Sequence, residues 1–456
     1  MRLATLFKVQ NTGPIFTSHR SVLRIMRADG SLTCGAIGGH ITSVSTYLTA
    51  AEMQLRTFSY KEWAGHEQEW ILDELLLGSR NLVVGKNASG KTRTLNVIYG
   101  LSAHFVGAGI PTLCDEFRAT FEHNEKQYIY ELDYKNRQVT HERLIIDGVV
   151  YLDRGENGIG EIVAEKVNSS NPTQRIPFQA PPHIVAVFVR RDAIQHSFLE
   201  PLFQWANEVR IYRFAGEGTK GNLAQFLDGG PEANDRDERQ VVGRFYATKK
   251  RFPDVFLEEL KKDLKFVGYE IDDVFVGPPN SVIFEVQGPA GTPALNCLLI
   301  RESGVRAVID QFSMSSGLFR VLALLIHVNA ALLNRSATTL LIDDIGEGLD
   351  FERSLALIQR VREKAAKSNL QLVISTNDKF VMDSIPLDEW TVLRRVQHRV
   401  TVQNYTNSKD LFDRFAFTGL KNFSFFEMNA TESVSIDMDE DDEDDEQDES
   451  GDPYHA

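Results

Sequence analysis

The chain has 456 residues, of which 42% are hydrophobic and 25% are charged. This is the composition of a globular protein with room for two or three domains. No run of about 18 apolar residues is present, so neither a membrane span nor a membrane partner is expected. The three cysteines, Cys34, Cys114 and Cys297, lie far apart without metal-ligand spacing. They argue against a disulfide framework and favour a reducing, cytoplasmic location.

Much of the net charge of −15 lies in one segment near the C-terminus. Residues 437–449 contain eleven carboxylates, so the rest of the chain carries only −4 of the total. The body of the protein is therefore not an obviously basic nucleic-acid binder, although a local basic groove leaves DNA open as a partner. Residues 427–456 are expected to be a disordered acidic tail, because like charges repel. The tail either keeps the protein soluble or mimics nucleic acid in such a groove.

Residues 1–52 differ in composition from the rest of the chain. They are rich in Ser, Thr, Gly and Arg, and Asp29 is the only acid before Glu52. They lack the apolar core of a secretory signal. Three interpretations stay open: a disordered extension, an over-extended start upstream of Met53, or an Arg-rich transit peptide. The folded domain is expected to begin at residue 53.

The first part of the domain is expected to contain strands followed by one helix. Residues 53–58 alternate between apolar and polar side chains, which is typical of an edge strand. The further strands and the helix are expected at residues 70–72, 75–77, 81–84 and 92–106.

An antiparallel β meander is expected next, because short alternating runs are separated by turn residues. Asp147-Gly148 is a typical hairpin turn. The meander strands are expected at residues 118–122, 128–132, 139–146 and 149–152.

The middle of the chain is less regular. A Gly-, Asn-, Ser- and Pro-rich stretch at 155–180 indicates a loop, residues 184–189 a short strand, and residues 251–264 a helix. Three more strands are expected at residues 274–276, 282–286 and 298–302. An α/β pattern occupies residues 312–385, and a last hairpin is expected over residues 391–405.

The strongest motif is the glycine-rich sequence of residues 85–92, Gly-Lys-Asn-Ala-Ser-Gly-Lys-Thr, between a strand and a helix. It has the P-loop pattern, in which glycines let backbone N–H groups approach phosphates and the helix start attracts them. Lys91 would supply charge to the phosphates and Thr92 a hydroxyl to Mg²⁺. The alternative is a glycine-rich turn without a ligand. The predicted nucleotide-binding residues are Gly85, Lys86, Asn87, Ala88, Ser89, Gly90, Lys91, Thr92 and Arg93.

A second motif supplies carboxylates. The apolar strand at residues 339–342 is followed by Asp343 and Asp344. Asp343 is expected to hold Mg²⁺ together with Thr92, and Asp344 to act as the general base that activates water. The alternative is that the two acids only solvate a strand end or cap a helix.

A third motif opens a long apolar helix that runs to residue 333. Ser315, Ser316 and Gly317 stand at its start. Ser and Gly at a helix N-terminus favour anion binding, although the same residues also form ordinary helix caps.

The order of these motifs resembles the ABC-type ATPases that are not transporters, the group of RecF, SMC heads and OLD-type proteins. The family's Leu-Ser-x-Gly signature is matched by Met314-Ser315-Ser316-Gly317. Residues 346–350, Gly-Glu-Gly-Leu-Asp, resemble the family's D-loop, and residues 371–378 resemble the strand that carries its switch residue. Within this group, the sequence is similar to the PtuA and AriA phage-defence ATPases.

The resemblance covers residues 53–426 and implies an α/β P-loop NTPase of the ABC-ATPase head type with an antiparallel β meander and a helical insertion. It divides the domain into a P-loop lobe (53–190), an insertion (191–310) and a signature lobe (311–426). It also implies ATP and Mg²⁺ held between two copies of the chain, and hence self-association. The site residues that it implies beyond the P-loop are Ser315, Ser316, Gly317 and Asp350 for nucleotide and Asp344, Glu347 and Asn377 for catalysis.

Three departures from the family pattern predict slow hydrolysis. Asp344 stands where Glu is usual, and Asn377 stands where a His is usual and cannot take up a proton. The Q-loop glutamine has no clear counterpart, because Gln127 and Gln138 both lie in the meander.

Three functions fit these features. The first is a nucleotide-gated switch in bacterial defence, acting with an effector nuclease or toxin in trans. The second is a RecF-like ATPase of DNA repair. The third is a scaffold that binds ATP without productive turnover.

Overall fold

The computed structural model describes residues 53–165, 174–214, 216, 220–225, 234, 236–282 and 295–428. The expectations for residues 1–52, for most of the strand at 282–286 and for the tail from residue 429 onward lie outside the described residues.

The described strands form two sheets. The strands of the main sheet are β1 (Gln54–Glu62), β2 (Trp70–Leu76), β3 (Arg80–Val84), β4 (Cys114–His123), β5 (Lys126–Lys135), β6 (Gln138–Ile146), β7 (Val149–Arg154), β8 (Ile159–Val163), β9 (Arg175–Gln179), β10 (Val209–Arg213), β15 (Thr339–Asp343), β16 (Gln371–Ser375), β17 (Trp390–Val396) and β18 (Arg399–Asn404). The strands of the second are β11 (Ala224–Gln225), β12 (Ile271–Gly277), β13 (Leu295–Glu302) and β14 (Val308–Asp310).

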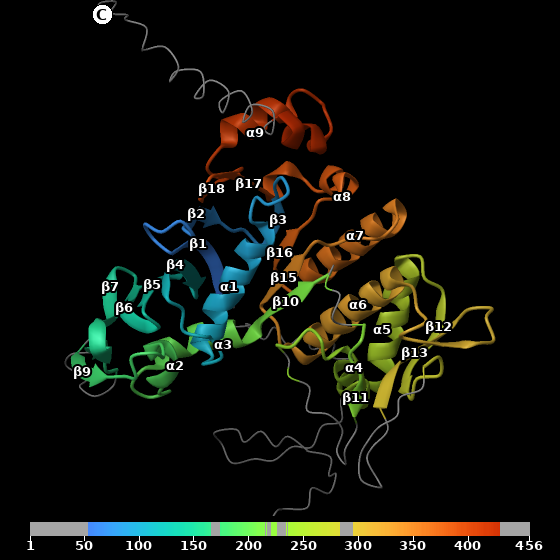
Figure 1. Cartoon of the computed structure of the whole chain (residues 1–456), viewed down its shortest axis with the longest axis horizontal. Helices are drawn as coiled ribbons and strands as arrows, with labels where there is room; N and C mark the ends of the chain where they lie inside the picture. The colour runs from blue at the N-terminus through green and yellow to red at the C-terminus, as the bar shows by residue number, and fades with distance from the viewer. Residues whose placement is uncertain are drawn as a thin grey trace, which may run out of the picture. The chain divides into compact units, whose positions relative to one another are not determined.

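The helices lie between and around these strands (Figure 1). They are α1 (Lys91–Phe105), α2 (Ala186–Val189), α3 (Glu200–Glu208), α4 (Val241–Arg251), α5 (Pro253–Phe266), α6 (Ser316–Asn334), α7 (Phe351–Lys367), α8 (Lys379–Ser384) and α9 (Lys409–Ala416). Short 3-10 turns occur at Glu156–Gly158, Ser197–Leu199 and Leu387–Glu389.

The main sheet has a parallel part at one end and a longer part in which the strand pairs are antiparallel except for β18 with β2. Its order is β10-β15-β16-β3-β17-β18-β2-β1-β4-β5-β6-β7-β8-β9. The first five strands are parallel, so their carboxyl ends meet at one edge. Strand β16 lies between β3, which leads into the P-loop, and β15, which ends in Asp343. This order brings the two predicted motifs to the same edge.

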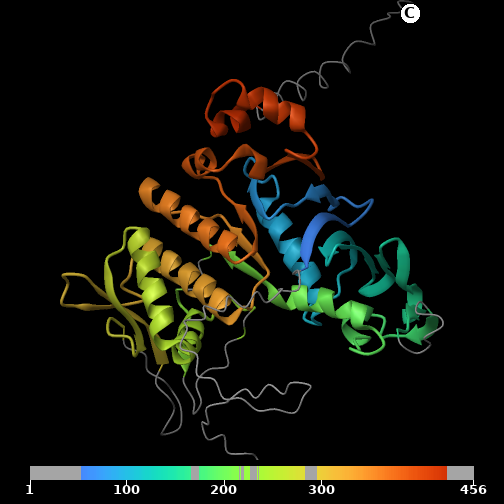
Figure 2. The ribbon, with the colours of Figure 1, turned by 180° about the vertical axis from the view of Figure 1, so that it is seen from behind.

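Both faces of the parallel part are buried. Side chains alternate across a strand, so Val83 joins one hydrophobic core while Leu82 and Val84 join the other. Helices α1 and α3 contribute to the first core, and α4 to α7 contribute to the second. Helices α5, α6 and α7 lie side by side in Figures 1 and 2. Strands buried on both faces account for the nearly continuous apolar runs in the sequence.

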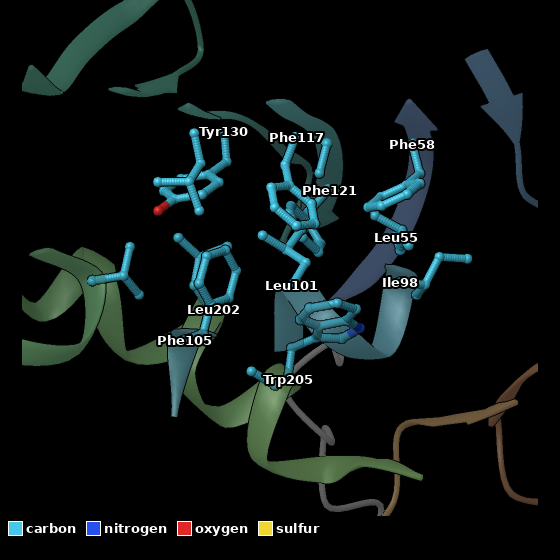
Figure 3. Packing of buried hydrophobic residues seen from close by; sticks show 14 of the residues in the cluster. Leu55, Phe58, Ile98, Leu101, Phe105, Phe117, Phe121, Tyr130, Leu202 and Trp205 are labelled. Atoms are coloured by element: carbon cyan, nitrogen blue, oxygen red, sulfur yellow. The ribbon is translucent and has the colours of Figure 1, made fainter. Parts of the chain in front are cut away.

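The first core combines aliphatic side chains with a group of packed aromatic rings (Figure 3). The rings of Phe121 and Trp205 meet edge-on with centroids 4.7 Å apart, and those of Phe105 and Tyr130 do the same at 4.7 Å. Edge-to-face pairs of this kind are favourable beyond the area that they bury. The meander strands β4 and β5 thereby close over helix α1, which the P-loop precedes.

Several sequence expectations hold in detail. The turn at Asp147 and Gly148 has positive φ at both residues, 48° and 78°, as a tight hairpin requires. The expected strand before Asp343, the helix from Ser316 and the hairpin over residues 391–405 are all present. The N-terminal strand is not at an edge, however, because β1 pairs with both β2 and β4.

Residues 184–189 form no strand, and the structure explains why. Helix α2 begins there because the backbone N–H groups of Ala186 and Val187 donate to the Glu142 carboxylate at 2.7 and 3.1 Å. A carboxylate at a helix N-terminus is stabilising, and Glu142 is too distant in sequence to be recognised. The expected loop at 155–180 also contains strands β8 and β9. Pro177 is tolerated in β9 because this is the outermost strand of the described sheet.

The helix expected at 251–264 is present as α5, and a separate helix, α4, ends just before it at Arg251. Pro253 starts α5, and Phe252 before it has φ −133°, because a residue preceding proline avoids the helical region. The segment expected as an insertion, residues 191–310, also contributes β10 to the main sheet. Its helix α3 packs in the first core. Helices α4 and α5 pack against α6, and the second sheet joins them in the second core.

One helix in the described part of the chain, α6, is long and apolar enough to cross a membrane, with a mean hydropathy of 1.8. However, 72% of this window is buried inside the protein. That is the position of a core helix rather than of a membrane span.

A fully buried ion pair holds the meander to α2. Glu142 and Arg154 are 0% exposed and lie 3.1 Å apart, and the Tyr130 hydroxyl donates to Glu142 at 2.9 Å. We predict that Glu142→Ala lowers the free energy of unfolding by about 3–5 kcal/mol, because it leaves a buried, unpaired guanidinium. Chemical denaturation measures this. Glu122→Ala, in the same meander at an exposed ion pair, is the control and should cost no more than about 1 kcal/mol. Equal losses in the two variants would contradict the prediction.

Candidate nucleotide-binding site

The P-loop follows β3 directly and turns sharply before α1. Ala88 and Gly90 have positive φ values of 65° and 101°. Gly90 lies against the buried Trp70 ring, which a Cβ would approach to 3.1 Å. Gly85 has still less room, since a Cβ there would lie 2.3 Å from the Ser89 hydroxyl oxygen. Both glycines of the motif are therefore required by the close approach of neighbouring atoms.

Lys91 is folded back over the loop that precedes it. Its Nζ donates to the carbonyl oxygens of Gly85 at 2.8 Å and Lys86 at 3.2 Å, and the residue is only 6% exposed. Burial lowers the pKa of Lys91, while the charges of Asp344 and Asp343 act against this shift. The two acids after β15 thus lie near enough to act electrostatically on the P-loop cation.

Ser375, at the end of β16, links the two acids. Its hydroxyl donates to Asp343 Oδ1 at 2.5 Å and accepts the Asp344 backbone N–H at 2.9 Å. Asp343 is 5% exposed, so its carboxylate is fixed next to the P-loop. The sequence shows Ser375 at the end of a predicted strand, but it does not show that this hydroxyl contacts the neighbouring strand.

Asp344 occupies an unusual position. Its φ of 51° is in the left-handed region, which Asp tolerates better than most residues. Asn377 Nδ2 donates to Asp344 Oδ1 at 3.3 Å. Burial raises the pKa of Asp344, and the nearby negative charges of Asp343 and Glu347 raise it further, against the influence of Lys91. The three residues predicted as catalytic, Asp344, Glu347 and Asn377, thus lie together.

The signature segment (Met314 to Gly317) and the D-loop segment (residues 346–350) are packed against each other. Ser315 caps α6 by accepting the Leu318 backbone N–H at 3.2 Å. A Cβ on Gly317 would lie 3.0 Å from Leu349 Cδ2. Ser316 stays exposed.

Two predicted ligand-binding residues already have partners within the chain. Arg93 forms an ion pair with Glu62 and lies over the Trp70 ring, 4.5 Å from its centroid. Asp350 caps α7 through the Arg353 backbone N–H at 3.0 Å and pairs with the Arg353 guanidinium at 2.5 Å. Both side chains remain partly exposed.

The oxygen atoms around the P-loop fit Mg²⁺ that is bound partly by phosphates and water. They do not fit a metal ion that is held by protein side chains alone. Among the described residues, no group of three or more His, Cys, Asp or Glu side chains could hold a metal ion. Thr92 offers an exposed hydroxyl and Asp343 a fixed carboxylate. Mg²⁺ commonly takes one or two such protein ligands and completes its shell with phosphates and water.

Comparison with known proteins gives the family. Residues 80–383 match the family described as "AAA domain, putative AbiEii toxin, Type IV TA system". The chain belongs to this family. The match includes the P-loop, the signature segment, both acids and Asn377. Together with the strand order, it confirms the predicted fold class of an α/β P-loop ATPase with a β meander and a helical insertion. No curated protein sequence matches the chain.

Solved structures similar to this chain include SMC heads. An SMC head bound to the C-terminal winged-helix domain of ScpA has 13% identity and a TM-score of 0.45, over 78% of this chain and 99% of that one. The head from Thermotoga maritima has 12% identity and a TM-score of 0.39, over 77% and 98%. A head with an extended coiled coil, bound to a ScpA domain derived from Pyrococcus furiosus, has 11% identity and a TM-score of 0.41, over 80% and 100%.

The packing at Gly85 can be tested. A methyl group there would meet the Ser89 hydroxyl at 2.3 Å and the Leu393 carbonyl at 2.8 Å. We expect Gly85→Ala to distort the P-loop and lower the melting temperature. Gly100→Ala is the matched control, since nothing lies within 4 Å of its added Cβ in the middle of α1. The free energy of unfolding of this variant should rise by about 0.5–1 kcal/mol, because Ala has a higher helix propensity than Gly. A Gly85→Ala protein as stable as the parent would refute the close contact.

Proposed function

We propose that this protein binds Mg-ATP at the P-loop and hydrolyses it slowly, as a nucleotide-gated switch that works through self-association. The observation that carries the proposal is the convergence of Lys91, Asp343, Asp344 and Asn377 at the carboxyl edge of β3, β15 and β16. Ligands bind at this edge in open parallel sheets. Thr92 and Asp343 would hold Mg²⁺, which would shield the phosphate charge.

Hydrolysis requires a base, and Asp344 is the proposed one. Its raised pKa makes the ionised form a better proton acceptor than an ordinary aspartate. Asn377, hydrogen-bonded to Asp344, would hold that carboxylate in place but cannot exchange a proton itself. Slow turnover is the expected result of this arrangement and suits a switch. The same two residues also support the rival proposal, a scaffold that binds ATP without productive turnover.

The proposed biological setting is bacterial defence. The family description refers to an AbiEii toxin and a type IV toxin–antitoxin system, which supports a role with a toxin or nuclease partner in trans. ATPase activity measured with and without DNA separates this role from DNA repair. A low rate that DNA does not change favours the defence switch, and stimulation by DNA favours a RecF-like repair enzyme.

The first of four predictions from the proposed function concerns nucleotide binding. Lys91→Ala should weaken Mg-ATP binding about tenfold to a hundredfold, because a charge-assisted hydrogen bond contributes about 1.5–3 kcal/mol. Isothermal titration calorimetry measures the affinity, and circular dichroism checks the fold. Lys126→Ala, at an exposed position in the meander, is the matched control and should bind like the parent. An unchanged dissociation constant for Lys91→Ala would sink the P-loop assignment.

The second prediction concerns the base. Asp344→Asn preserves size and tolerates the same left-handed backbone, so the fold should survive. ATP hydrolysis should fall by about 10²–10⁴-fold if Asp344 is the general base, while ATP binding persists. Single-turnover assays and equilibrium binding measure the two effects separately. Hydrolysis at the parent rate would exclude Asp344 as the base.

The third prediction uses pH to separate Asp344 from Glu347. The Glu347 charge helps to raise the pKa of Asp344. Glu347→Gln removes that charge and favours the ionised form of Asp344, so the acidic limb of the rate profile should move to lower pH. Because ATP itself titrates, the rates of the variant and the parent are compared at each pH, which cancels this contribution to the profile. If Glu347 were the base instead, the variant would lose hydrolysis at every pH.

Self-association is proposed because the P-loop and the signature segment belong to opposite faces of the sheet. Helix α1 packs in the first core, whereas α6 packs in the second. The exposed Ser316 at the start of α6 is thus better placed to meet a nucleotide bound to another copy. ATP held between two copies would join them.

The fourth prediction tests this assembly. Ser316→Glu places a carboxylate where the proposed partner's phosphates would lie, and should abolish ATP-promoted self-association without weakening binding to the single chain. Sedimentation velocity with and without Mg-ATP, in an Asp344→Asn background, measures the mass. Ser368→Glu adds the same charge at an exposed site after α7 and should assemble normally. Assembly of Ser316→Glu at the level of Ser368→Glu would contradict this arrangement.

A further inference from the structure

Arg395 lies beside the P-loop although it is about 300 residues away in the sequence. It belongs to β17, which runs parallel to β3 with Val392 opposite Val84. This register carries the next residues of β17 along the loop, and the Leu393 carbonyl oxygen lies 2.8 Å from a Cβ built on Gly85. Arg395 comes two residues later, and its Nη1 lies 3.4 Å from the Ala88 carbonyl oxygen.

The charge of Arg395 is not balanced by an acid. Its hydrogen bonds go to two backbone carbonyls, Ala88 at 3.4 Å and Gln397 at 2.8 Å, and it forms no ion pair within the described part of the chain. Arg399 on the same hairpin pairs instead with Asp73 at 2.9 Å. Arg395 is also close enough to Arg93 for its charge to lower the pKa of that residue, after the larger effect of burial.

A guanidinium beside a phosphate-binding loop that no acid balances, such as that of Arg395, favours an anionic ligand. A phosphate oxygen accepts a charge-assisted hydrogen bond from a guanidinium, which is stronger than the bond to a neutral carbonyl such as that of Ala88. Arg395 is exposed, so its side chain has room to turn from that carbonyl to a phosphate. The same move would relieve its repulsion with Arg93.

We propose that Arg395 is a nucleotide-binding residue that contacts the phosphate chain of ATP bound at the P-loop of its own chain. This inference rests on the proposed function, since it assumes ATP in that site. It adds a ligand from the C-terminal hairpin that no sequence motif marks. The hairpin β17–β18 would then form one wall of the phosphate site, opposite the acids at the end of β15.

The test is Mg-ATP binding by the full chain, with Arg395→Gln, Arg395→Lys and Arg399→Gln compared with the parent. Arg395→Gln should weaken binding about tenfold, as expected for one exposed charge-assisted hydrogen bond. Arg395→Lys should recover part of the loss, because it keeps the charge but not the planar fork. Arg399→Gln is the matched control and should bind like the parent.

Two further measurements separate a phosphate contact from other roles. Tripolyphosphate carries no base, so its own dissociation constant, obtained by competition with ATP, should rise in Arg395→Gln by a similar factor. Unchanged tripolyphosphate binding would overturn the phosphate contact in favour of one with the base or sugar. The melting temperature of Arg395→Gln without ligand should equal that of the parent. If it drops, and if Arg395→Lys recovers no binding, Arg395 only supports the loop.

The inference and the proposed function fail in different ways. If the parent does not bind Mg-ATP, or Lys91→Ala binds as the parent does, both are overturned. If Lys91→Ala loses binding while Arg395→Gln binds normally, only the role of Arg395 is overturned.

Discussion

The Lys91 ammonium is almost completely buried, and a buried charge is costly unless other groups compensate for it. Two loop carbonyls and the charges of Asp343 and Asp344 provide that compensation. The carbonyls converge only because the loop turns through the left-handed conformations of Ala88 and Gly90. The carboxylates face Lys91 only because β16 separates β15 from β3. The turn of the P-loop backbone and the order of the strands therefore both contribute to the compensation of the buried Lys91 charge.

The same sheet explains how the site can be both rigid and open. Its parallel strands are buried on both faces, so the strand ends are held by two cores at once. Ser375 then ties the end of β16 to both acids after β15. The P-loop residues from Lys86 to Ala88 remain exposed beyond these fixed ends. A ligand would thus meet prepositioned charged groups without having to open the core.

The sequence predicted the features that depend on neighbours along the chain. The P-loop, the strand ending in Asp343 and the hairpin turn at Asp147 each have a local pattern with a physical reason. It could not predict features set by contacts across the fold. Helix α2 depends on Glu142, more than forty residues earlier. Ser375 acquires its role only because β16 lies beside β15.

Residues 236–238 contact helices on both faces of the main sheet. On the α1 side, the Tyr99 hydroxyl donates to the Arg236 carbonyl at 3.1 Å. On the α6 side, His327 lies 2.9 Å from the Glu238 carbonyl. Arg213, at the end of the edge strand β10, pairs with the Glu238 carboxylate at 2.5 Å. Burial is the main cause that lowers the pKa of His327 to about 3. This histidine is therefore neutral at neutral pH, and its contact with the Glu238 carbonyl is one between uncharged groups. Residues 236–238 thus contact both the helix after the P-loop and the helix of the signature segment, which lie on opposite faces of the sheet.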